Sequence, residues 1–448
     1  MTTAQLDHIR IRAGELMERN GWSREKLLAH QASRLQDLLR HAVEHSPYYR
    51  DAFGAGPWRL ADLPTLPKAT LMENFDRIVT DPEVTLAGVE EHLRGEQAGE
   101  PLLGRYRVLA TSGTTGLRGY VLMSDDEFET WMALHMRVFA AIGIGPGTRV
   151  AAIGAPSPLH WSRRLFEALR SGREDAPSLT VATPAAETLG ALNAYQPQAL
   201  LGYPSIHATL ADWQLEGRLR IRPEFVVAGG EAVTEDVASR IRAAWGIEPI
   251  VVYPTTEAPL IAAASAQGRE LEIVEDLLVV EVVDEDDRPV PAGTPGAKVL
   301  MTSLVSRALP LIRYAISDAV TLAAGPNPAG RPYARIERVD GRLADTLVLP
   351  GRAGGTVAVH PIKLGPAFAG VPEVRRFQVI HDETGIEVRA VVSAEDALER
   401  VRERLVAVLE EAGAVPPTVR AVAVDELERE PGPAAKFRIV KSAFAAQG

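Results

Sequence analysis

The chain has 448 residues, with 48 Lys and Arg against 59 Asp and Glu, and its formal net charge at pH 7 is −11. A single hydrophobic core stops growing well below this length, so we expect two or more domains. The acidic balance leaves no electrostatic footprint for nucleic acid, and the absence of cysteine excludes disulfides, thiolate catalysis and cysteine-ligated zinc.

The sequence indicates neither membrane insertion nor secretion. No apolar stretch approaches the ~20 residues that a membrane-spanning helix needs. The first residues, Met-Thr-Thr-Ala-Gln-Leu-Asp-His, lack the apolar core of a signal peptide. We therefore expect a soluble, cytoplasmic protein without nucleic-acid or membrane partners. The oligomeric state stays open, a homodimer included.

Residues 1–95 are predicted to be helical and irregular. Leucine and alanine recur at helical spacing between Leu27 and Val43, and the run His-Ser-Pro-Tyr-Tyr at 45–49 breaks that pattern. The segment Leu63–Lys68 reads Leu-Pro-Thr-Leu-Pro-Lys, and its two prolines predict a stiff, extended connector.

The stretch 108–124 carries the strongest functional signal. Two apolar runs flank a turn of glycines and hydroxyl residues, whose members are Thr111, Ser112, Gly113, Thr114, Thr115 and Gly116. Glycines let the backbone approach a ligand closely, and hydroxyls with exposed N–H groups make a concave donor surface for phosphate oxygens. A Walker A loop would need a lysine here, and none occurs between Lys68 and Lys298. An ordinary polar hairpin turn stays the alternative.

From 105 to about 325, short apolar strands alternate with amphipathic helices. Helices are predicted at 124–141 and 234–245, the second with a capped Thr-Glu-Asp start. The predicted strands are 150–153, 179–181, 199–201, 225–228, 250–253, 277–283, 297–302 and 319–323. The alternation predicts an α/β fold, with a large layered N-terminal domain of mostly parallel sheets.

A domain boundary is predicted near Gly341 and Arg342. We expect a large domain at 1–341, a hinge at 342–346 and a small, mobile α+β domain at 347–448. In the small domain the predicted elements are strands at 377–381, 387–392 and 418–424 and a helix at 394–412.

Two polar segments follow predicted strands, where a parallel sheet leaves its ligand crevice. Gly229-Gly230-Glu231 comes after one strand, and Tyr253-Pro254-Thr255-Thr256-Glu257 comes after the next. Each has a structural alternative. Gly-Gly-Glu can be a helix-capping turn, and Thr-Thr-Glu can be a helix N-cap with an acid favoured by the helix dipole.

In order, these motifs resemble those of the adenylate-forming superfamily of acyl-CoA synthetases, peptide-synthetase adenylation domains and luciferases. The loop 111–116 is similar to the family's phosphate-binding loop, 310–318 to its ribose-binding segment, and 341–345 to its linker motif. The stretch 296–318, the two N-terminal segments Ser-Pro-Tyr-Tyr-Arg and Leu-Pro-Thr-Leu-Pro-Lys, and the loop without lysine resemble the phenylacetate-CoA ligase branch.

The resemblance implies where ATP binds. The phosphates would lie on the loop 111–116, and Gly229–Glu231 would lie along the adenine, with Tyr253 stacked on it. Asp318 would accept both ribose hydroxyls, as a carboxylate suits a cis-diol. Arg342 would donate to the ribose or a phosphate.

The resemblance also implies a metal and a catalytic cation. Thr256 would contact the α-phosphate and Glu257 would hold Mg²⁺, a cation that prefers carboxylate and phosphate oxygens. Lys436 lies on a Pro-Gly loop, from which an ammonium group could stabilise the charge that builds up as the adenylate forms. Lys441 is the competing candidate.

Three departures from the family pattern affect the prediction. Pro254 replaces a usual glycine but leaves the contacting side chains in place. Ala344 stands where the family has an Asp or Lys pivot between two domain orientations. The glycine-rich stretch after Gly351 is longer than the family's matching loop, which helps to shape the thiol-entry face. Acyl transfer is therefore less firmly predicted than adenylation.

The acyl pocket is weakly encoded. His160-Trp161 and Tyr203 each follow a predicted strand, where the family lines its acyl pocket with an aromatic residue. Buried structural roles are the alternative at each position.

The leading hypothesis is an ATP- and Mg²⁺-dependent ligase that forms an acyl adenylate, aryl or arylacetyl by subfamily, and transfers the acyl group to CoA. One alternative passes the adenylate to an amine or a carrier protein. Another is a non-catalytic nucleotide-binding protein, against which the joint presence of Glu257, Asp318, Arg342 and Lys436 counts. The sequence does not reveal which carboxylic acid is used.

Overall fold

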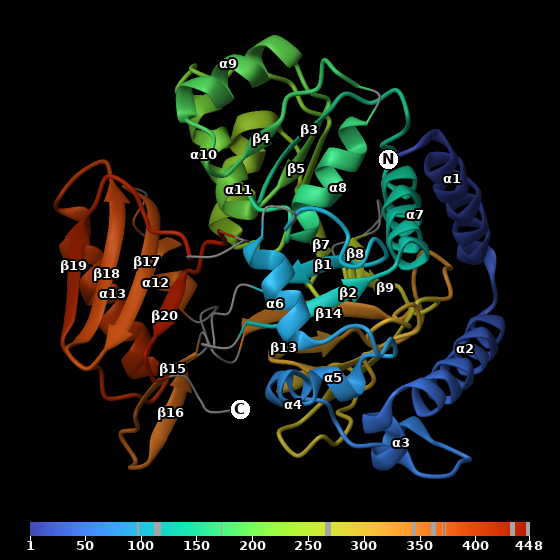
Figure 1. Cartoon of the computed structure of the whole chain (residues 1–448). Coiled ribbons are helices and arrows are strands. Elements are labelled where there is room, and N and C mark those ends of the chain that lie inside the picture. The colour runs from blue at the N-terminus through green and yellow to red at the C-terminus, as the bar shows by residue number, and fades with distance from the viewer. Residues whose placement is uncertain are drawn as a thin grey trace.

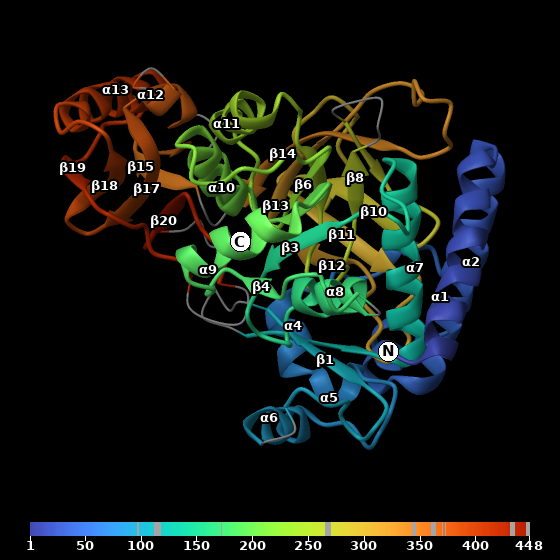
Figure 2. The same cartoon turned by 90° about the horizontal axis from the view of Figure 1, so that it is seen from above.

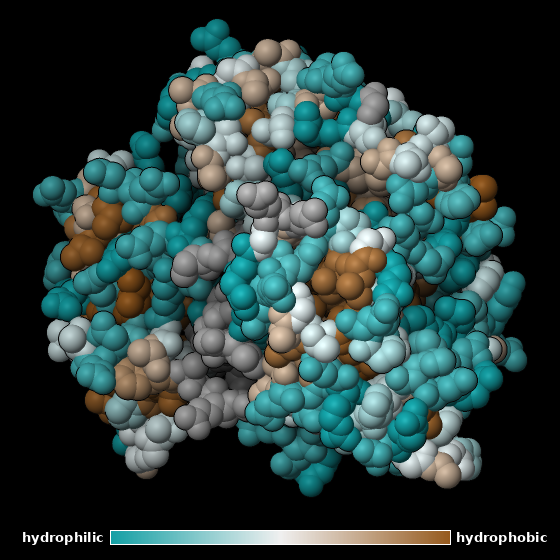
Figure 3. Space-filling model, in the orientation of Figure 1, coloured by the Kyte–Doolittle hydropathy of each residue, from teal (hydrophilic) through white to brown (hydrophobic). Residues whose placement is uncertain are grey.

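The computed structural model describes residues 1–95, 98–111, 118–171, 173–264, 270–342, 346–359, 364–369, 371, 373–430 and 435–444. It confirms the predicted α/β fold. A large N-terminal module (residues 1–342) is built around a nine-stranded sheet, and a C-terminal module (residues 346–444) lies at its side (Figure 1). Within the described ranges no helix is long and apolar enough to cross a membrane, and the face shown in Figure 3 is predominantly hydrophilic.

The chain begins with helices, as predicted. They are α1 (Thr3–Glu18), η1 (Arg19–Gly21), α2 (Arg24–His45), α3 (Pro47–Phe53), η2 (Leu60–Asp62), α4 (Lys68–Glu73), α5 (Phe75–Ile78) and α6 (Leu86–Arg94). Helices α1 and α2 lie on the side of the N-terminal module away from the C-terminal module (Figures 1 and 2). Between η2 and α4, Leu66 runs extended: its N–H donates to the Arg313 carbonyl at 2.9 Å, and its carbonyl accepts from Ala315 N at 3.0 Å.

The nine-stranded sheet has the order β13-β14-β9-β8-β7-β6-β5-β3-β4. Strands β4, β3, β5, β6 and β7 are parallel, whereas the remaining pairings are antiparallel. Its strands are β3 (Val150–Gly154), β4 (Leu179–Thr180), β5 (Ala199–Gly202), β6 (Phe225–Gly229), β7 (Ile250–Tyr253), β8 (Ala262–Ala264), β9 (Leu271–Ile273), β13 (Asp318–Leu322) and β14 (Arg335–Arg342). The helices between the parallel strands are α8 (Trp161–Arg170), α9 (Ala185–Tyr195), α10 (Pro204–Leu215) and α11 (Glu235–Trp245).

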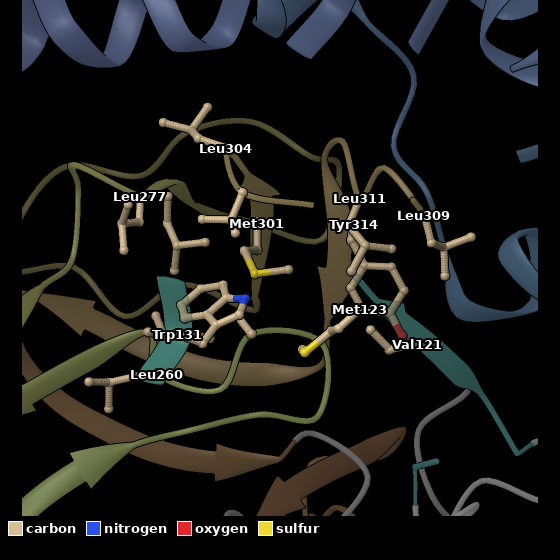
Figure 4. Packing of buried hydrophobic residues seen from close by; sticks show 14 of the residues in the cluster. Val121, Met123, Trp131, Leu260, Leu277, Met301, Leu304, Leu309, Leu311 and Tyr314 are labelled. Carbon is tan, nitrogen blue, oxygen red and sulfur yellow. The ribbon is translucent and has the colours of Figure 1, made fainter. Parts of the chain in front are cut away.

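Two smaller sheets complete the N-terminal module. The loop 111–119 connects the antiparallel hairpin strands β1 (Arg107–Ala110) and β2 (Tyr120–Met123), and α7 (Asp125–Ala141) follows. The other sheet is antiparallel and contains β10 (Leu278–Val283), β11 (Lys298–Ser303) and β12 (Tyr314–Ile316). Between them lies a common core, in which Trp131 of α7 lies among side chains such as Met301, Leu260 and Met123 (Figure 4).

The C-terminal module has a hydrophobic core of its own, formed by buried side chains between Leu347 and Val440. Its elements are β15 (Leu347–Pro350), β16 (Thr356–Val359), α12 (Gly365–Ala369), β17 (Val374–Asp382), β18 (Gly385–Val392), α13 (Ala397–Glu411), β19 (Val419–Ala423) and β20 (Val440–Ser442). The sheet order is β19-β18-β17-β20, and β15 pairs with β16. The division into domains at 1–341 and 347–448 with a hinge at 342–346 stays a prediction.

Helix capping explains two of the sequence predictions. Ser124 accepts from Glu127 N while the Glu127 carboxylate accepts from Ser124 N, so that α7 begins at Asp125. Thr234 caps α11 by accepting from Val237 N at 3.3 Å. Both helices therefore begin where the sequence predicts.

Candidate active site

The parallel half of the sheet places four loops at one edge. Strands β3, β5, β6 and β7 run in the same direction, so their carboxyl ends meet there, and this edge is where α/β sheets bind ligands. Four segments with predicted site residues lie at these carboxyl ends. Residues 160–161 follow β3, residue 203 follows β5, residues 229–231 lie at the end of β6, and residues 253–257 lie at the end of β7.

The hairpin loop is closed at its base by Thr111. Its N–H donates to the Gly119 carbonyl at 2.9 Å, and its hydroxyl accepts from Gly119 N at 2.8 Å. The predicted phosphate-binding residues Ser112, Gly113, Thr114, Thr115 and Gly116 lie outside the described residues.

Lys68 is a candidate that the sequence interpretation missed. It is the first residue of α4, and its Nζ donates to the Thr111 hydroxyl at 2.8 Å. An ammonium group therefore lies at the base of the predicted phosphate loop, although the loop itself has no lysine. The signal was present, because lysine is rare in this chain and one closes the connector Leu63–Lys68. A search confined to the loop could not find it.

Packing and backbone conformation favour the two glycines at the end of β6. A Cβ on Gly229 would lie 2.5 Å from Val252 Cγ2 and 2.8 Å from the Val252 carbonyl oxygen. Gly230 has φ +81°, and a Cβ there would lie 3.1 Å from the Tyr203 ring and 3.8 Å from Lys436 Cε. The chain can thus turn sharply and bring Tyr203 and Lys436 together.

Glu231, the third residue of this segment, is engaged by the C-terminal module. Its carboxylate accepts from Phe437 N at 2.7 Å, from Ser205 N at 3.1 Å and from Arg429 Nη1 at 3.4 Å. Its side chain is only 5% exposed. The segment lies at the predicted edge, but the carboxylate itself contacts the C-terminal module.

The residues predicted for adenine and ribose come together from three strands. The Tyr253 hydroxyl donates to Asp318 Oδ2 at 2.6 Å, and both residues are buried. Asp318 begins β13 and is paired in register with Arg342, the last residue of β14. A carboxylate that accepts one hydroxyl at this position is suited to accept others.

The segment after β7 places Glu257 beside Tyr314. The Thr255 hydroxyl accepts from Ala258 N at 3.0 Å, which holds a tight turn, and Thr256 is half-buried beside it. Glu257 Oε1 accepts from the Tyr314 hydroxyl at 2.8 Å. Within the described ranges, no three His, Asp or Glu side chains gather into a metal site, so a cation here would need Glu257 together with ligand oxygens.

A cavity of about 740 Å³, including its open mouth, lies at this edge of the sheet. Most of its wall is apolar, and His160, Trp161 and Tyr203, the predicted acyl-pocket residues, line it. The other lining residues include Val138, Phe139, Leu165, Phe166, Leu201, Val227, Pro254, Thr255 and Leu260. This wall suits an uncharged, apolar group.

Two buried histidines of the cavity are neutral. Burial lowers the pKa of His135 to about 4, and its ring is held between the Trp131 carbonyl at 2.8 Å and Trp161 Nε1 at 3.4 Å. Burial and then the charge of Lys436 lower the pKa of His160 to about 3. His160 Nδ1 accepts from Ser162 N at 3.2 Å, so the neutral ring carries its proton on Nε2.

The two candidate catalytic lysines differ in position. Lys436 lines the cavity with His160 and Thr255. Lys441 lies in β20 and forms an ion pair with Glu430 at 3.9 Å. Lys436 therefore lies at the predicted site, and its catalytic role stays a prediction.

The fold, the Tyr253–Asp318 pair and the lysine at an apolar cavity agree with the resemblance to the adenylate-forming superfamily. Residues 106–307 match the model of the AMP-binding enzyme family. The chain is 28% identical over 372 residues to a phenylacetate-coenzyme A ligase of Thermus thermophilus, with 78% of this chain and 77% of the relative covered. It is 21% identical to a fumarate–(S)-2,3-diaminopropanoate ligase of Enterobacter agglomerans, with 75% of this chain and 83% of the relative covered.

Among solved structures, a 2-hydroxyisobutyryl-CoA ligase has the same fold. Its postadenylation state matches with a TM-score of 0.74 at 21% identity, covering 95% of this chain and 91% of that one. Its thioesterification state matches with a TM-score of 0.61 at 22% identity and the same coverage. These findings confirm the resemblance to the adenylate-forming superfamily and its phenylacetate-CoA ligase-like branch, and this protein is an AMP-forming, ligase-type enzyme.

Proposed function

We propose that this protein activates a carboxylic acid with ATP and transfers the acyl group to CoA. In the first step a carboxylate oxygen attacks the α-phosphorus of ATP, the bond to the β-phosphate oxygen breaks, and pyrophosphate leaves an acyl adenylate. In the second step the CoA sulfur attacks the acyl carbon, and AMP leaves. The similarity to phenylacetate-coenzyme A ligases supports an aryl or arylacetyl substrate.

One observation carries this proposal: Lys436 of the C-terminal module lines the apolar cavity together with Pro254 and Thr255 of the segment that follows β7. The cavity accepts the acyl group, and its carboxylate then lies beside Lys436. The ammonium group stabilises the negative charge shared by the carboxylate and the α-phosphate in the transition state. The neutral ring of His160 carries its proton on Nε2, so it offers a hydrogen-bond donor that adds no positive charge.

The nucleotide is held by groups from separate elements. Tyr253 and Asp318 hold adenine and ribose, Arg342 supports the ribose or a phosphate, and the loop 111–116 cradles the phosphates. Lys68 supplies to that loop the positive charge that its own sequence lacks.

Glu257 and the phosphate oxygens would hold Mg²⁺, which neutralises charge on the phosphates as pyrophosphate leaves. The carboxylate fits this role, because Tyr314 fixes one of its oxygens and hard oxygen ligands are what Mg²⁺ prefers.

Transfer to an amine is the second candidate. A relative named as a ligase of fumarate and diaminopropanoate favours it. Two departures from the family pattern also favour it: Ala344 at the pivot position, and the long glycine-rich stretch after Gly351, whose matching loop helps to shape the thiol-entry face.

A pyrophosphate-release assay with ATP and a panel of aryl, arylacetic and aliphatic acids tests the first step. Mass spectrometry of the products, with CoA in one arm and amines in the other, identifies the acceptor. If none of the acids in the panel supports pyrophosphate release, the proposed function is contradicted. An acyl amide product without a thioester supports the amine alternative.

A further inference from the structure

A partly buried ion pair joins the two modules next to Lys436. The Glu231 side chain is 5% exposed, that of Arg429 is 21% exposed, and the two charges are 3.4 Å apart. Glu231 comes from the turn after β6, and Arg429 comes from the segment between β19 and β20. Figures 1 and 2 show the C-terminal module beside α10 and α11, the helices that flank this turn.

The same two residues attach the chain on both sides of Lys436. Before it, the Ala435 carbonyl accepts from Arg429 Nη1 at 3.1 Å. After it, Phe437 N donates to Glu231 at 2.7 Å. Arg429 Nη2 also donates to the Ser205 hydroxyl at 3.0 Å, which anchors the guanidinium to α10. The backbone of Lys436 is therefore fixed at both neighbours while its side chain lines the cavity.

Further contacts between the modules surround this pair. Arg240 of α11 donates to the Val374 carbonyl at 3.3 Å, Arg376 donates to the Thr209 hydroxyl at 3.3 Å, and Arg375 pairs with Glu216 at 3.1 Å. Only the Glu231–Arg429 pair, among these contacts, bonds directly to the neighbours of Lys436.

The energetics of such a pair suit a reversible contact. Removing two charges from water costs about as much as their attraction returns, so a buried ion pair fixes geometry more than it adds stability. When the modules separate, water re-enters and restores the hydration of both charges. The contact can therefore be specific without locking the modules permanently.

We propose that Glu231, Arg429 and Ser205 form a clamp that positions Lys436 for adenylate formation and opens before acyl transfer. The inference rests on the proposed function. The three are positioning residues, since they act through Lys436. The greater similarity to the postadenylation state than to the thioesterification state of the solved ligase agrees with a closed clamp in this arrangement.

The kinetic test separates the half-reactions. Arg429→Met should slow ATP–pyrophosphate exchange by about tenfold, the effect of losing one charge-assisted hydrogen-bonding group. Acyl transfer from supplied acyl adenylate to CoA should be unchanged or faster. Glu231 keeps its two backbone donors in this variant, so folding should persist. Arg429→Lys should restore most of the exchange rate because it retains a charge.

The matched control is Arg420→Met. Arg420 is exposed on β19 and donates to Thr384 within the same module, so both half-reactions should keep the parent's rates. Equal slowing of both half-reactions in Arg429→Met, or no slowing of either, overturns the clamp.

A distance measurement tests the clamp without catalysis. The chain has no cysteine, so Ala186→Cys on α9 and Val422→Cys on β19 introduce the only two sites for spin labels. Both positions are exposed. The interlabel distance distribution should broaden when Arg429→Met is added and stay narrow with Arg420→Met.

An unchanged distribution in Arg429→Met overturns the clamp whatever the kinetics show. If the parent shows no ATP–pyrophosphate exchange with any acid, the proposed function is contradicted instead. The interlabel distances still test the clamp in that case.

Discussion

Replacement of Lys436 by alanine is the most informative single perturbation of this protein. Its ammonium group lines an apolar cavity and lies close enough to His160 to lower the pKa of that ring. Water screens a charge less in such surroundings than at an open surface. Removal of one preorganised donor of this kind slows catalysis by about 10²–10³-fold. We therefore expect Lys436→Ala to slow adenylate formation by that factor.

The same variant should leave ATP affinity nearly unchanged, because the interaction strengthens only as charge develops in the transition state. Acyl transfer from supplied acyl adenylate should persist. The assays are single-turnover adenylate formation, equilibrium ATP binding and CoA transfer. Lys441→Ala is the control, since Lys441 lies in β20, pairs with Glu430 and is not part of the cavity wall. A large defect in Lys441→Ala alone would refute the assignment of Lys436, and two silent variants would show that the C-terminal module delivers no catalytic cation.

Four further outcomes are expected. Lys68→Met should weaken ATP binding about tenfold or more by titration calorimetry, since it removes a charge from the phosphate loop; unchanged affinity contradicts its role there. Asp318→Ala should weaken ATP binding by ~1–3 kcal/mol, and parent-like binding would show the ribose assignment to be wrong. Glu257→Gln should reduce Mg²⁺-dependent adenylation far more than the melting temperature, and an unchanged rate at saturating Mg²⁺ refutes it. Finally, the free energy of unfolding should fall as the pH drops from about 6.5 toward 4. The unfolded chain then binds protons that folded His135, with its pKa of about 4, does not; equal stability at pH 7 and pH 5 in denaturant titrations would contradict this.

Local chemistry explains what the sequence predicted well. The N-terminal ends of α7 and α11 follow from capping bonds between residues three positions apart, Ser124 with Glu127 and Thr234 with the backbone of Val237. Strands β3, β5, β6 and β7 are short apolar runs between helices, and their carboxyl ends determine where the polar segments meet. The predicted acyl-pocket residues His160, Trp161 and Tyr203 line one cavity for this reason.

Long-range pairing explains what the sequence did not predict. Lys68 reaches Thr111 across 43 residues, and Glu231 reaches Arg429 across 198. No periodicity or motif spacing encodes such distances. The sequence did not predict the antiparallel half of the central sheet for the same reason. Strand β14 pairs with both β13 and β9, and the two partners lie at very different distances from it along the chain.

The Gly229-Gly230-Glu231 segment shows how one motif can have several causes. Its two glycines are favoured even without a nucleotide, because Val252 leaves no room for a side chain at Gly229 and the φ of +81° at Gly230 strains any other residue there. Its carboxylate is occupied by the C-terminal module, which brings Lys436 to the cavity. A substitution at either glycine should therefore displace Tyr203 or Val252, whereas a substitution at Glu231 should act through the clamp. The resemblance of this segment to a nucleotide-binding motif predicts its place in the fold, but packing and module contact explain each of its three residues.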